Sequence, residues 1–474
     1  MSNIKLLISF LSIFLFSIEM VAESKGQAPS NRIKFPGGKT YLYRITLADK
    51  QGTPYSISRP EMFLSKKSLD RRTRQAIKVD STDLPISPQY VARLCEIGGV
   101  EIVCKSKWNN TVLVKTHSVS TSKAIESLPF VVKTEKVFTS PDSIESSSRT
   151  LYHDELNKRD DTNSDTEYGM TSNNIDMVNG RWLHRLGYKG RGMTIAVFDG
   201  GFMNADKIPA LKEVKIAGYR DFVAIKSDNI FQEHDHGTKV LSTMAVNVPG
   251  VFVGTAPEAE YWLFRVEDTY TESLAEEDYW AAAAEYADSV GVDIISSSLG
   301  YQEFDDKSTS HVYSELDGRH ALISKTASRL SSKGIIHVNS AGNSGMGTWK
   351  KINFPADAHD ILAVGAVNSK RINASFSSVG PSDDGRVKPD IMSLGSPATV
   401  ITGRGAISND MGTSFAAPIV SGMVACLWQS SPKSTASEIM DAIRRGADQY
   451  NAPNNIFGYG IADFEKSYRI LKNK

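Results

Sequence analysis

The C-terminal two thirds of the chain repeats one pattern: a short apolar stretch, a turn, and a longer stretch with helical spacing. Short apolar runs predict buried strands, whereas longer periodic runs predict helices. Such alternation is typical of a mostly parallel sheet covered by helices, an α/β fold. We expect strands at 193–198, 261–266, 292–296, 334–339 and 361–367, and helices at 236–247, 276–290, 321–333, 414–429, 436–446 and 464–471. Ligands of such sheets bind beyond the carboxyl ends of the strands, so the informative residues should lie there.

Charge divides the chain into parts. The 474 residues carry 54 basic and 54 acidic side chains, and 41% are hydrophobic. This composition is ordinary for a globular protein and excludes a collagen-like, largely disordered or multi-span membrane chain. Residues 31–139 carry 19 basic and 9 acidic side chains, whereas residues 166–474 carry 30 and 36. Residues 140–165 are polar and lack apolar periodicity, so we interpret them as an exposed linker.

Residues 1–22 have the pattern of a secretory signal peptide. Lys5 precedes an apolar stretch at 6–18, and the small residue Ala22 follows. That stretch is too short to cross a bilayer comfortably, and no other approaches ~18 apolar residues. We expect a secreted or periplasmic protein with no membrane association after signal cleavage. Export permits a disulfide between Cys95 and Cys104, and two unpaired thiols are equally compatible with the sequence.

Residues 31–139 predict a small α+β domain. Its expected strands are 40–47, 100–104, 111–114 and 130–132, and its expected helices are 89–97 and 120–127. This domain also carries a basic cluster of Lys66, Lys67, Arg71, Arg72 and Arg74. The zero net charge of the whole chain argues against nucleic acid as a partner. We therefore interpret the cluster as a solvated helix face.

Four short stretches at the expected strand ends and helix starts carry residues suited to catalysis. Asp199 ends a strand and precedes two glycines, and His236 begins a helix. Asn343 follows a strand, and Ser414 begins an apolar helix. Each alone is typical of an ordinary turn or helix start. In combination they supply a nucleophile, a base for its proton, a carboxylate that orients the base, and an amide donor for an oxyanion.

Residues 166–470 resemble the subtilisin-like serine proteases, the subtilases. The chain order acid, histidine, serine is that of subtilisin. The stretches Gly254-Thr255-Ala256-Pro257 and Ser296-Ser297-Ser298-Leu299-Gly300 also resemble landmarks of the family. The resemblance implies a three-layer catalytic domain with a mostly parallel central sheet at 166–474. It also implies that residues 31–139 are a propeptide that inhibits the enzyme and assists folding, and that the linker 140–165 holds the processing site.

The resemblance further implies roles for individual residues. Ser414 would be the nucleophile, His236 the general base and then acid, and Asp199 its orienting carboxylate. The side-chain amide of Asn343 and the backbone N–H of Ser414 would form the oxyanion hole. The family usually has a hydroxyl residue directly after the catalytic acid, where this chain has Gly200.

A substrate cleft is implied in the same way. An extended peptide would pair with one segment, and the side chain before the scissile bond would enter a pocket between it and a second segment. Counting back from Phe354-Pro355 places Asn353 at the pocket floor, with its amide facing either inward or outward. The first segment is Ser298, Leu299 and Gly300, and the second is Ser340, Ala341 and Gly342.

The expected chemistry requires no cofactor. Structural calcium is common in the family, but no acidic loop of this chain has a ligand spacing that supports it. We expect a monomer that acts on polypeptides and is inhibited by its own propeptide. Two alternatives remain open: an exported triad hydrolase acting on esters or other acyl groups, and a catalytically silent binding protein on the same scaffold.

Overall fold

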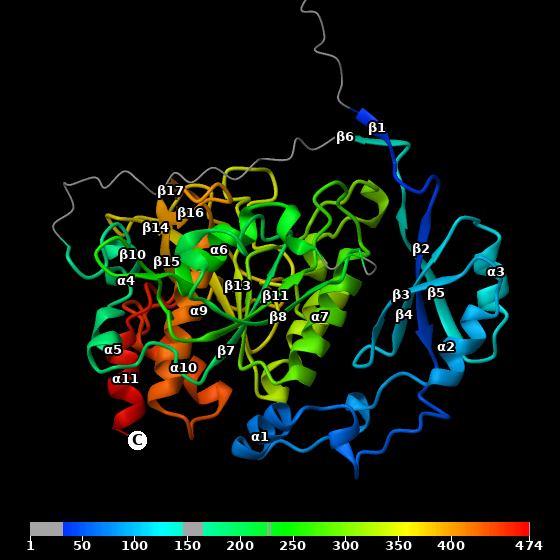
Figure 1. The fold of residues 1–474 in the computed structure, drawn as a ribbon, viewed down its shortest axis with the longest axis horizontal. Helices are drawn as coiled ribbons and strands as arrows, with labels where there is room; N and C mark the ends of the chain where they lie inside the picture. Colours follow the sequence, from blue (N-terminus) through cyan, green and yellow to red (C-terminus); the bar gives the residue numbers. More distant parts are fainter. Residues whose placement is uncertain (1–31, 146–164, 225–226, 228, 474) are drawn as a thin grey trace, which may run out of the picture.

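The computed structural model describes residues 32–145, 165–224, 227 and 229–473, which form two units lying against each other (Figure 1). The smaller unit is coloured blue to cyan, and the larger one contains the rest of the chain. The predicted signal peptide at 1–22 and residues 146–164 of the predicted linker lie outside the described residues.

The larger unit is built on a seven-stranded sheet in the order β15-β14-β13-β12-β7-β11-β8. Its neighbouring strands pair in parallel, as the alternating pattern predicted. The strands are β7 (Thr194–Asp199), β8 (Lys215–Asp221), β11 (Glu260–Arg265), β12 (Ile294–Ser297), β13 (Ile336–Ser340), β14 (Leu362–Asn368) and β15 (Ile391–Ser396).

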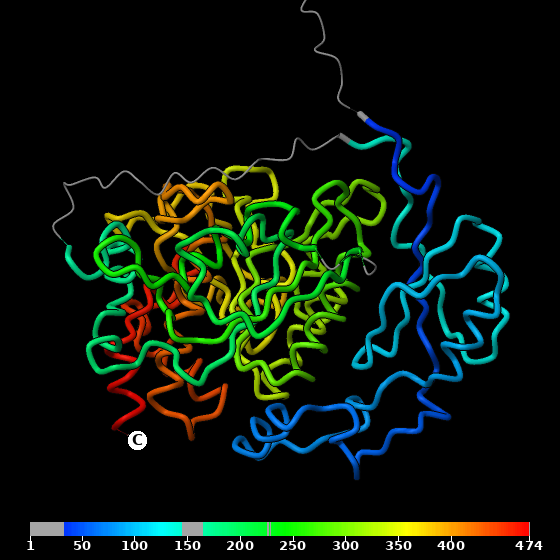
Figure 2. The backbone as a smooth tube through the Cα atoms, in the orientation of Figure 1, coloured from blue at the N-terminus to red at the C-terminus, as the bar shows by residue number. Residues whose placement is uncertain are grey.

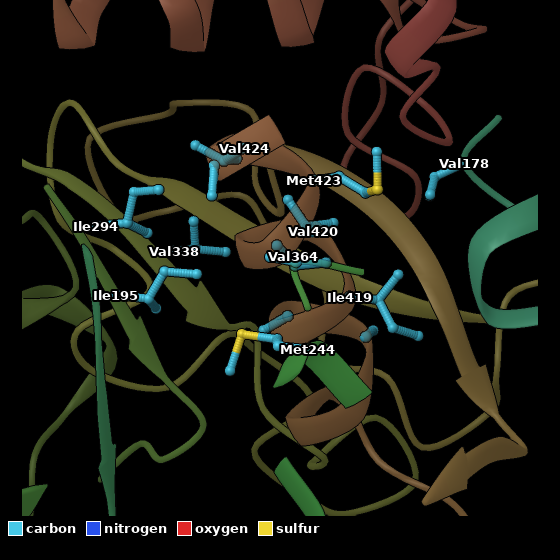
Figure 3. Close-up of a cluster of buried hydrophobic side chains, with 14 of the residues drawn as sticks. Val178, Ile195, Met244, Ile294, Val338, Val364, Ile419, Val420, Met423 and Val424 are labelled. Carbon is cyan, nitrogen blue, oxygen red and sulfur yellow. The ribbon is translucent and has the colours of Figure 1, made fainter. Parts of the chain in front are cut away.

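Helices cover both faces of this sheet and give three layers. On one face, Ile195 and other strand residues pack against α9 (Thr413–Ser430), as Figure 3 shows for Val338 and Val420. On the other face, Phe198 packs against Trp280 of α7 (Glu276–Val290). The first face also carries α6 (His236–Ala245) and α10 (Ala436–Gly446), and the remaining helices of this unit include α4 (Ser172–Asp176), α5 (Arg181–Arg185), α8 (Leu322–Ala327) and α11 (Phe464–Lys472).

The smaller unit is an antiparallel sheet in the order β3-β4-β2-β5 with two helices. One face of the sheet packs on those helices through Ile45 and Leu94. The opposite face contributes Leu42 and Leu113 to the same buried cluster as α7 of the larger unit. The elements are β2 (Tyr41–Leu47), α2 (Pro88–Cys95), β3 (Glu101–Ser106), β4 (Thr111–Thr116), α3 (Thr121–Glu126) and β5 (Val131–Thr139).

The basic cluster is only in part the solvated helix face that we expected: Lys66, Lys67 and Arg74 are exposed, whereas the other two residues are not. It lies on α1 (Lys66–Arg74), in a segment that extends from the smaller unit beneath the larger one (Figure 2). Arg71 and Arg72 are each only 1% exposed. Both pair with Asp288 of α7, which is fully buried. The prediction was wrong for Arg71 and Arg72, because the sequence of the small domain alone does not show the acidic partner that covers these two charges.

Other differences are local. The sequence did not predict the edge strands β8 and β15, nor the hairpin of β16 (Ala398–Ile401) and β17 (Ile407–Asp410). The helix expected at 321–333 stops at Ala327, because the Leu330 N–H bonds to the carbonyl three residues back and tightens the turn. Within the predicted linker, β6 (Ser143–Glu145) pairs with β1 (Arg32–Lys34).

The cysteine alternatives are resolved in favour of unpaired thiols. Cys95 is exposed and free, and Cys104 is partly buried and free. Among the residues that the structure describes, no helix has the length and apolar character needed to cross a bilayer.

Candidate active site

The four residues singled out by the sequence meet at the carboxyl edge of the large sheet. Asp199 is the last residue of β7, and His236 is the first residue of α6. Ser414 lies in the first turn of α9, and Asn343 follows β13. Because parallel strands end at one edge, residues more than 200 positions apart in the chain come together there.

Asp199 and His236 form a charge-assisted pair. The Nδ1 atom of His236 lies 2.9 Å and 3.0 Å from the two carboxylate oxygens of Asp199, which is 1% exposed. The carboxylate can only accept, so Nδ1 carries the proton and Nε2 is left as the acceptor. Burial lowers the pKa of His236, but the attraction of Asp199 outweighs it and raises that pKa to about 9. This pair has the geometry of a base held by a carboxylate.

Ser414 is held by the neighbouring strand segment. Its Oγ donates a hydrogen bond to the carbonyl of Ser298 at 3.1 Å, and the Ser298 hydroxyl donates to the carbonyl of Ser414 at 2.8 Å. Among the described residues, no hydrogen bond joins the Ser414 hydroxyl to His236. A rotation about the Cα–Cβ bond is needed to point the hydroxyl toward Nε2, which is common in structures without substrate.

Asn343 is oriented by the residue before the serine. Its Oδ1 accepts hydrogen bonds at 3.0 Å from both the backbone N–H and the hydroxyl of Thr413. These two bonds fix the orientation of the amide, so its NH₂ group points away from Thr413. Neither that NH₂ group nor the backbone N–H of Ser414 has a hydrogen-bond partner among the described residues. Two free donors beside the serine are what an oxyanion requires.

One cleft joins these groups to the expected substrate segments. Its cavity has a volume of about 720 Å³ and is lined by His236, Asn343 and Ser414. Five of the six residues of the two expected segments also line it, namely Ser298, Leu299, Gly300, Ser340 and Gly342. Ala341 does not line this cavity, since its side chain is fully buried in the core.

Asn353 lies between the two segments, so its side chain faces inward. A Cβ atom on residue 300 or 342 would come within 3.0 Å of the Asn353 side chain. The Ser344 hydroxyl donates to the Asn353 amide oxygen at 3.3 Å. Asn353 also lines the cleft. Of the two orientations left open by the sequence, the structure has the one that places a polar group in the pocket.

The cleft is also lined by four acidic residues that the sequence analysis did not single out: Glu267, Asp268, Glu272 and Asp305. Three of them follow directly after β11, so their position at the end of a predicted strand was the available signal. Gly200 makes room for this segment, since a Cβ atom at residue 200 would lie 2.9 Å from Oε2 of Glu267. The glycine that departs from the family pattern therefore accommodates a carboxylate beside the Asp–His pair.

Comparisons with known proteins agree with this geometry. The profile of the subtilase family, Peptidase S8, matches residues 190–460. The profile of the Peptidase S8 propeptide domain of Bacteroidota matches residues 42–153, which include the smaller sheet.

Similar individual proteins are proteases from several organisms. Subtilisin-like protease SBT6.1 of Arabidopsis thaliana is 30% identical over 308 residues, covering 61% of this chain and 27% of that protein. Membrane-bound transcription factor site-1 protease of Rattus norvegicus is 29% identical and is covered to 26% of its length. Subtilisin DY of Bacillus licheniformis is 28% identical and is covered to 96% of its length. The chain thus spans about a quarter of the first two relatives and nearly all of the third. Given the matched profile and the assembled site, the chain belongs to the subtilase family.

Proposed function

We propose that this protein is an exported serine endopeptidase made as a zymogen. The observation that carries the proposal is the convergence of the Asp199–His236 pair, Ser414 and Asn343 on a single cleft. The proposed chemistry needs no cofactor, because the nucleophile, the base and the oxyanion donors are all groups of this chain.

The geometry supports acyl transfer through a covalent intermediate. The Ser414 hydroxyl, once turned toward Nε2 of His236, loses its proton to that nitrogen as Oγ attacks the scissile carbonyl. The tetrahedral oxyanion accepts hydrogen bonds from the Asn343 amide and the Ser414 backbone N–H. Protonated His236, stabilised by Asp199, then donates its proton to the leaving amine, and water releases the acyl group by the reverse sequence.

The smaller unit is the proposed intramolecular inhibitor. It packs on α7 through a shared apolar cluster and through buried ion pairs, including that of Arg44 with Asp278 at 2.6 Å. Processing within residues 140–165 would separate it from the catalytic domain. We propose that the signal at 1–22 directs export and that the mature enzyme is a monomer acting on polypeptides.

A test with three readouts separates this function from its alternatives. The processed protein should react with a fluorophosphonate probe and hydrolyse casein, and Ser414→Ala should abolish both. Hydrolysis of esters without casein cleavage would instead indicate the ester hydrolase. Absence of labelling in a folded, processed protein would indicate the silent binding protein.

A further inference from the structure

The four acidic residues of the cleft, Glu267, Asp268, Glu272 and Asp305, form what we call the acidic wall. They come from the segment between β11 and α7 and from the loop that follows Tyr301. The two segments are joined by a hydrogen bond from the Glu272 backbone N–H to the Asp305 carboxylate at 3.1 Å. The wall shares its cavity with Ser414 and His236, so a peptide bound for cleavage would lie beside it.

The acidic wall is attracted by His236 and Arg265, which lower the pKa of Glu267, but neither side chain forms an ion pair with it. No Lys, Arg or His among the described residues forms an ion pair with any of its four carboxylates. Arg265, at the end of β11, is already engaged by Asp221 at 3.0 Å and by Glu233 at 3.7 Å. Burial and then mutual repulsion raise the pKa of Glu272 to about 8. Burial and the neighbouring Asp199 raise that of Glu267 to about 7.

A buried hydroxyl next to the acidic wall is also unsatisfied. The Tyr301 side chain is 1% exposed, and its hydroxyl has no hydrogen-bond partner. Burial and then the charges of Glu276, Glu267 and Glu272 raise the pKa of Tyr301 well above its usual value. A buried hydroxyl without a partner is costly. Tyr301 itself does not line the cleft, so the four carboxylates of the acidic wall are the groups within reach of a bound ligand.

The arrangement suits an organic cation better than a metal ion. Among the described residues, no group of three or more His, Cys, Asp or Glu side chains is placed so as to hold a metal ion. A guanidinium or ammonium group on a long side chain reaches carboxylates that line a cleft and presents several donors to them.

We propose that the acidic wall makes this enzyme select peptides with arginine or lysine within the four residues that precede the scissile bond. This inference rests on the proposed function and specifies its substrate class. We expect the acyl part of the substrate to lie along the strand segment Ser298, Leu299 and Gly300, as the resemblance to subtilases implies and as the position of these residues in the cleft allows. A cationic side chain from that part would enter the wall and provide the missing positive charge.

The test uses internally quenched peptides of one sequence, with Arg, Lys, Gln or Glu placed singly at each of the four positions before the scissile bond. Assays at pH 9 keep the acidic wall ionised, and mass spectrometry confirms the cleaved bond. We expect kcat/KM to be about tenfold higher for Arg and Lys than for Gln at one or more positions, and lowest for Glu. Equal values for Arg and Gln at all four positions would overturn the proposal.

Variants of the acidic wall test whether it causes the preference for basic peptides. In Glu272→Gln and Glu267→Gln the ratio of Arg to Gln peptides should fall toward one, and in Glu272→Lys the Glu peptide should overtake the Arg peptide. The matched control is Glu213→Gln, an exposed acid outside the cleft, which should keep the wild-type ratio. A ratio unchanged in all three wall variants would refute the role of the acidic wall.

Two further readouts distinguish failure of this inference from failure of the proposed function. Fluorophosphonate labelling together with cleavage that ignores the basic residue would reject this inference and leave the proposed function intact. Loss of labelling and of cleavage in the wild type would reject both. A rise in Tm with calcium that Glu272→Gln removes, without any change in peptide preference, would identify the wall as a metal site and overturn the proposal.

Discussion

The oxygen and the nitrogen of the Asn343 side-chain amide have different interactions. Oδ1 accepts from Thr413, whereas the NH₂ group is free for an oxyanion. Asn343→Asp keeps the acceptor and replaces the donor with a negative charge. We expect kcat to fall by at least about 100-fold with little change in KM, a magnitude measured for this donor in subtilisin itself. Asn451→Asp, an exposed substitution outside the cleft, is the control, and equal kcat values for the two variants would contradict the assignment.

We expect Asn353 to limit how far the specificity pocket accepts large side chains. Its inward amide accepts from Ser344 and donates to the carbonyl of Gly300, but its remaining N–H and lone pair would be unsatisfied against an aromatic ring, which typically costs ~1–3 kcal/mol. We expect the wild type to prefer Ala, Leu, Met or Gln over Phe and Tyr at the residue before the scissile bond. Asn353→Gly should raise kcat/KM selectively for the aromatic peptides. Equal turnover of Ala, Leu and Phe peptides by both proteins would show that Asn353 does not shape the pocket.

Glu267 should influence the pH dependence of catalysis through His236. Around Glu267 stand Asp199 from β7, His236 from α6, and Arg265 and Asp268 from its own segment. His236 accepts a proton only when neutral, and its pKa is raised to about 9, so kcat/KM should rise with pH through this range. Removing the Glu267 charge lowers that pKa.

In Glu267→Gln, the acidic limb of the pH profile of kcat/KM should therefore move to lower pH, by about one unit. A peptide without basic residues isolates this effect from substrate preference. Glu213→Gln should leave the limb in place. A limb that stays in place in Glu267→Gln as well would show that this carboxylate does not act on His236.

At the scale of elements, strands buried on both faces were the most predictable. β7 matches its expected bounds within one residue, because the apolar run at 195–198 is uninterrupted, and α7 matches its expected bounds at both ends. The edge strand β8 was missed because its alternating side chains are largely exposed and read as loop. The end of α8 was missed because hydroxyl groups of Thr326 and Ser328 bond to carbonyls four residues back, a competition that composition does not show.

The candidate site was predictable where one residue type determines the chemistry. Asp199, His236 and Ser414 were found from short motifs at strand ends and helix starts. The acidic wall was not found, because Glu and Asp in a loop are ordinary in sequence and acquire meaning only from the neighbours that the fold supplies. Arg72 was misread for the same reason, since its partner Asp288 is 216 residues away.

Helix α1 should be a major anchor of the propeptide. Arg72 bridges Asp83 of its own unit at 2.9 Å and Asp288 of α7 at 2.8 Å, and breaking such a buried pair costs about 3–5 kcal/mol. Residues 31–139 produced separately should inhibit the mature enzyme, and Arg72→Gln should weaken that inhibition by about 100-fold or more. Arg93→Gln, which removes an exposed charge paired only with Glu96, is the control. Similar inhibition constants for the two variants would contradict the anchor.

The same interface predicts a salt dependence. The basic propeptide faces acidic residues of the larger unit, including Glu260, Asp278 and Asp288. Opposite charges steer association, so the on-rate of the separate propeptide should fall as salt rises to the physiological range. An on-rate that is indifferent to ionic strength would remove electrostatic steering from the binding step.

At the scale of the whole molecule, the two ends of the processing region are fixed to different units. Ser143–Glu145 pairs with β1 of the smaller unit. On the other side, Asp165 pairs with Arg181 and the ring of Tyr168 is fully buried in the larger unit. We call residues 146–164 the processing window. A cut outside this window would have to break those contacts, so processing should fall between Glu145 and Asp165.

The position of the cut inside that window follows from the acidic wall. Residues 146–164 contain three basic residues, namely Arg149, Lys158 and Arg159. If the enzyme processes itself and selects a basic residue within four positions before the scissile bond, the mature N-terminus should lie at 150–153 or 159–163. N-terminal sequencing of the mature protein measures this directly, and in Ser414→Ala the precursor should persist unless another protease cleaves it. Replacing all three basic residues with Gln should slow maturation, whereas replacing Asp160 and Asp161 with Asn should not. A mature N-terminus after Tyr168 would contradict the window, and maturation of the triple variant at the wild-type rate would show that the basic residues do not direct the cut.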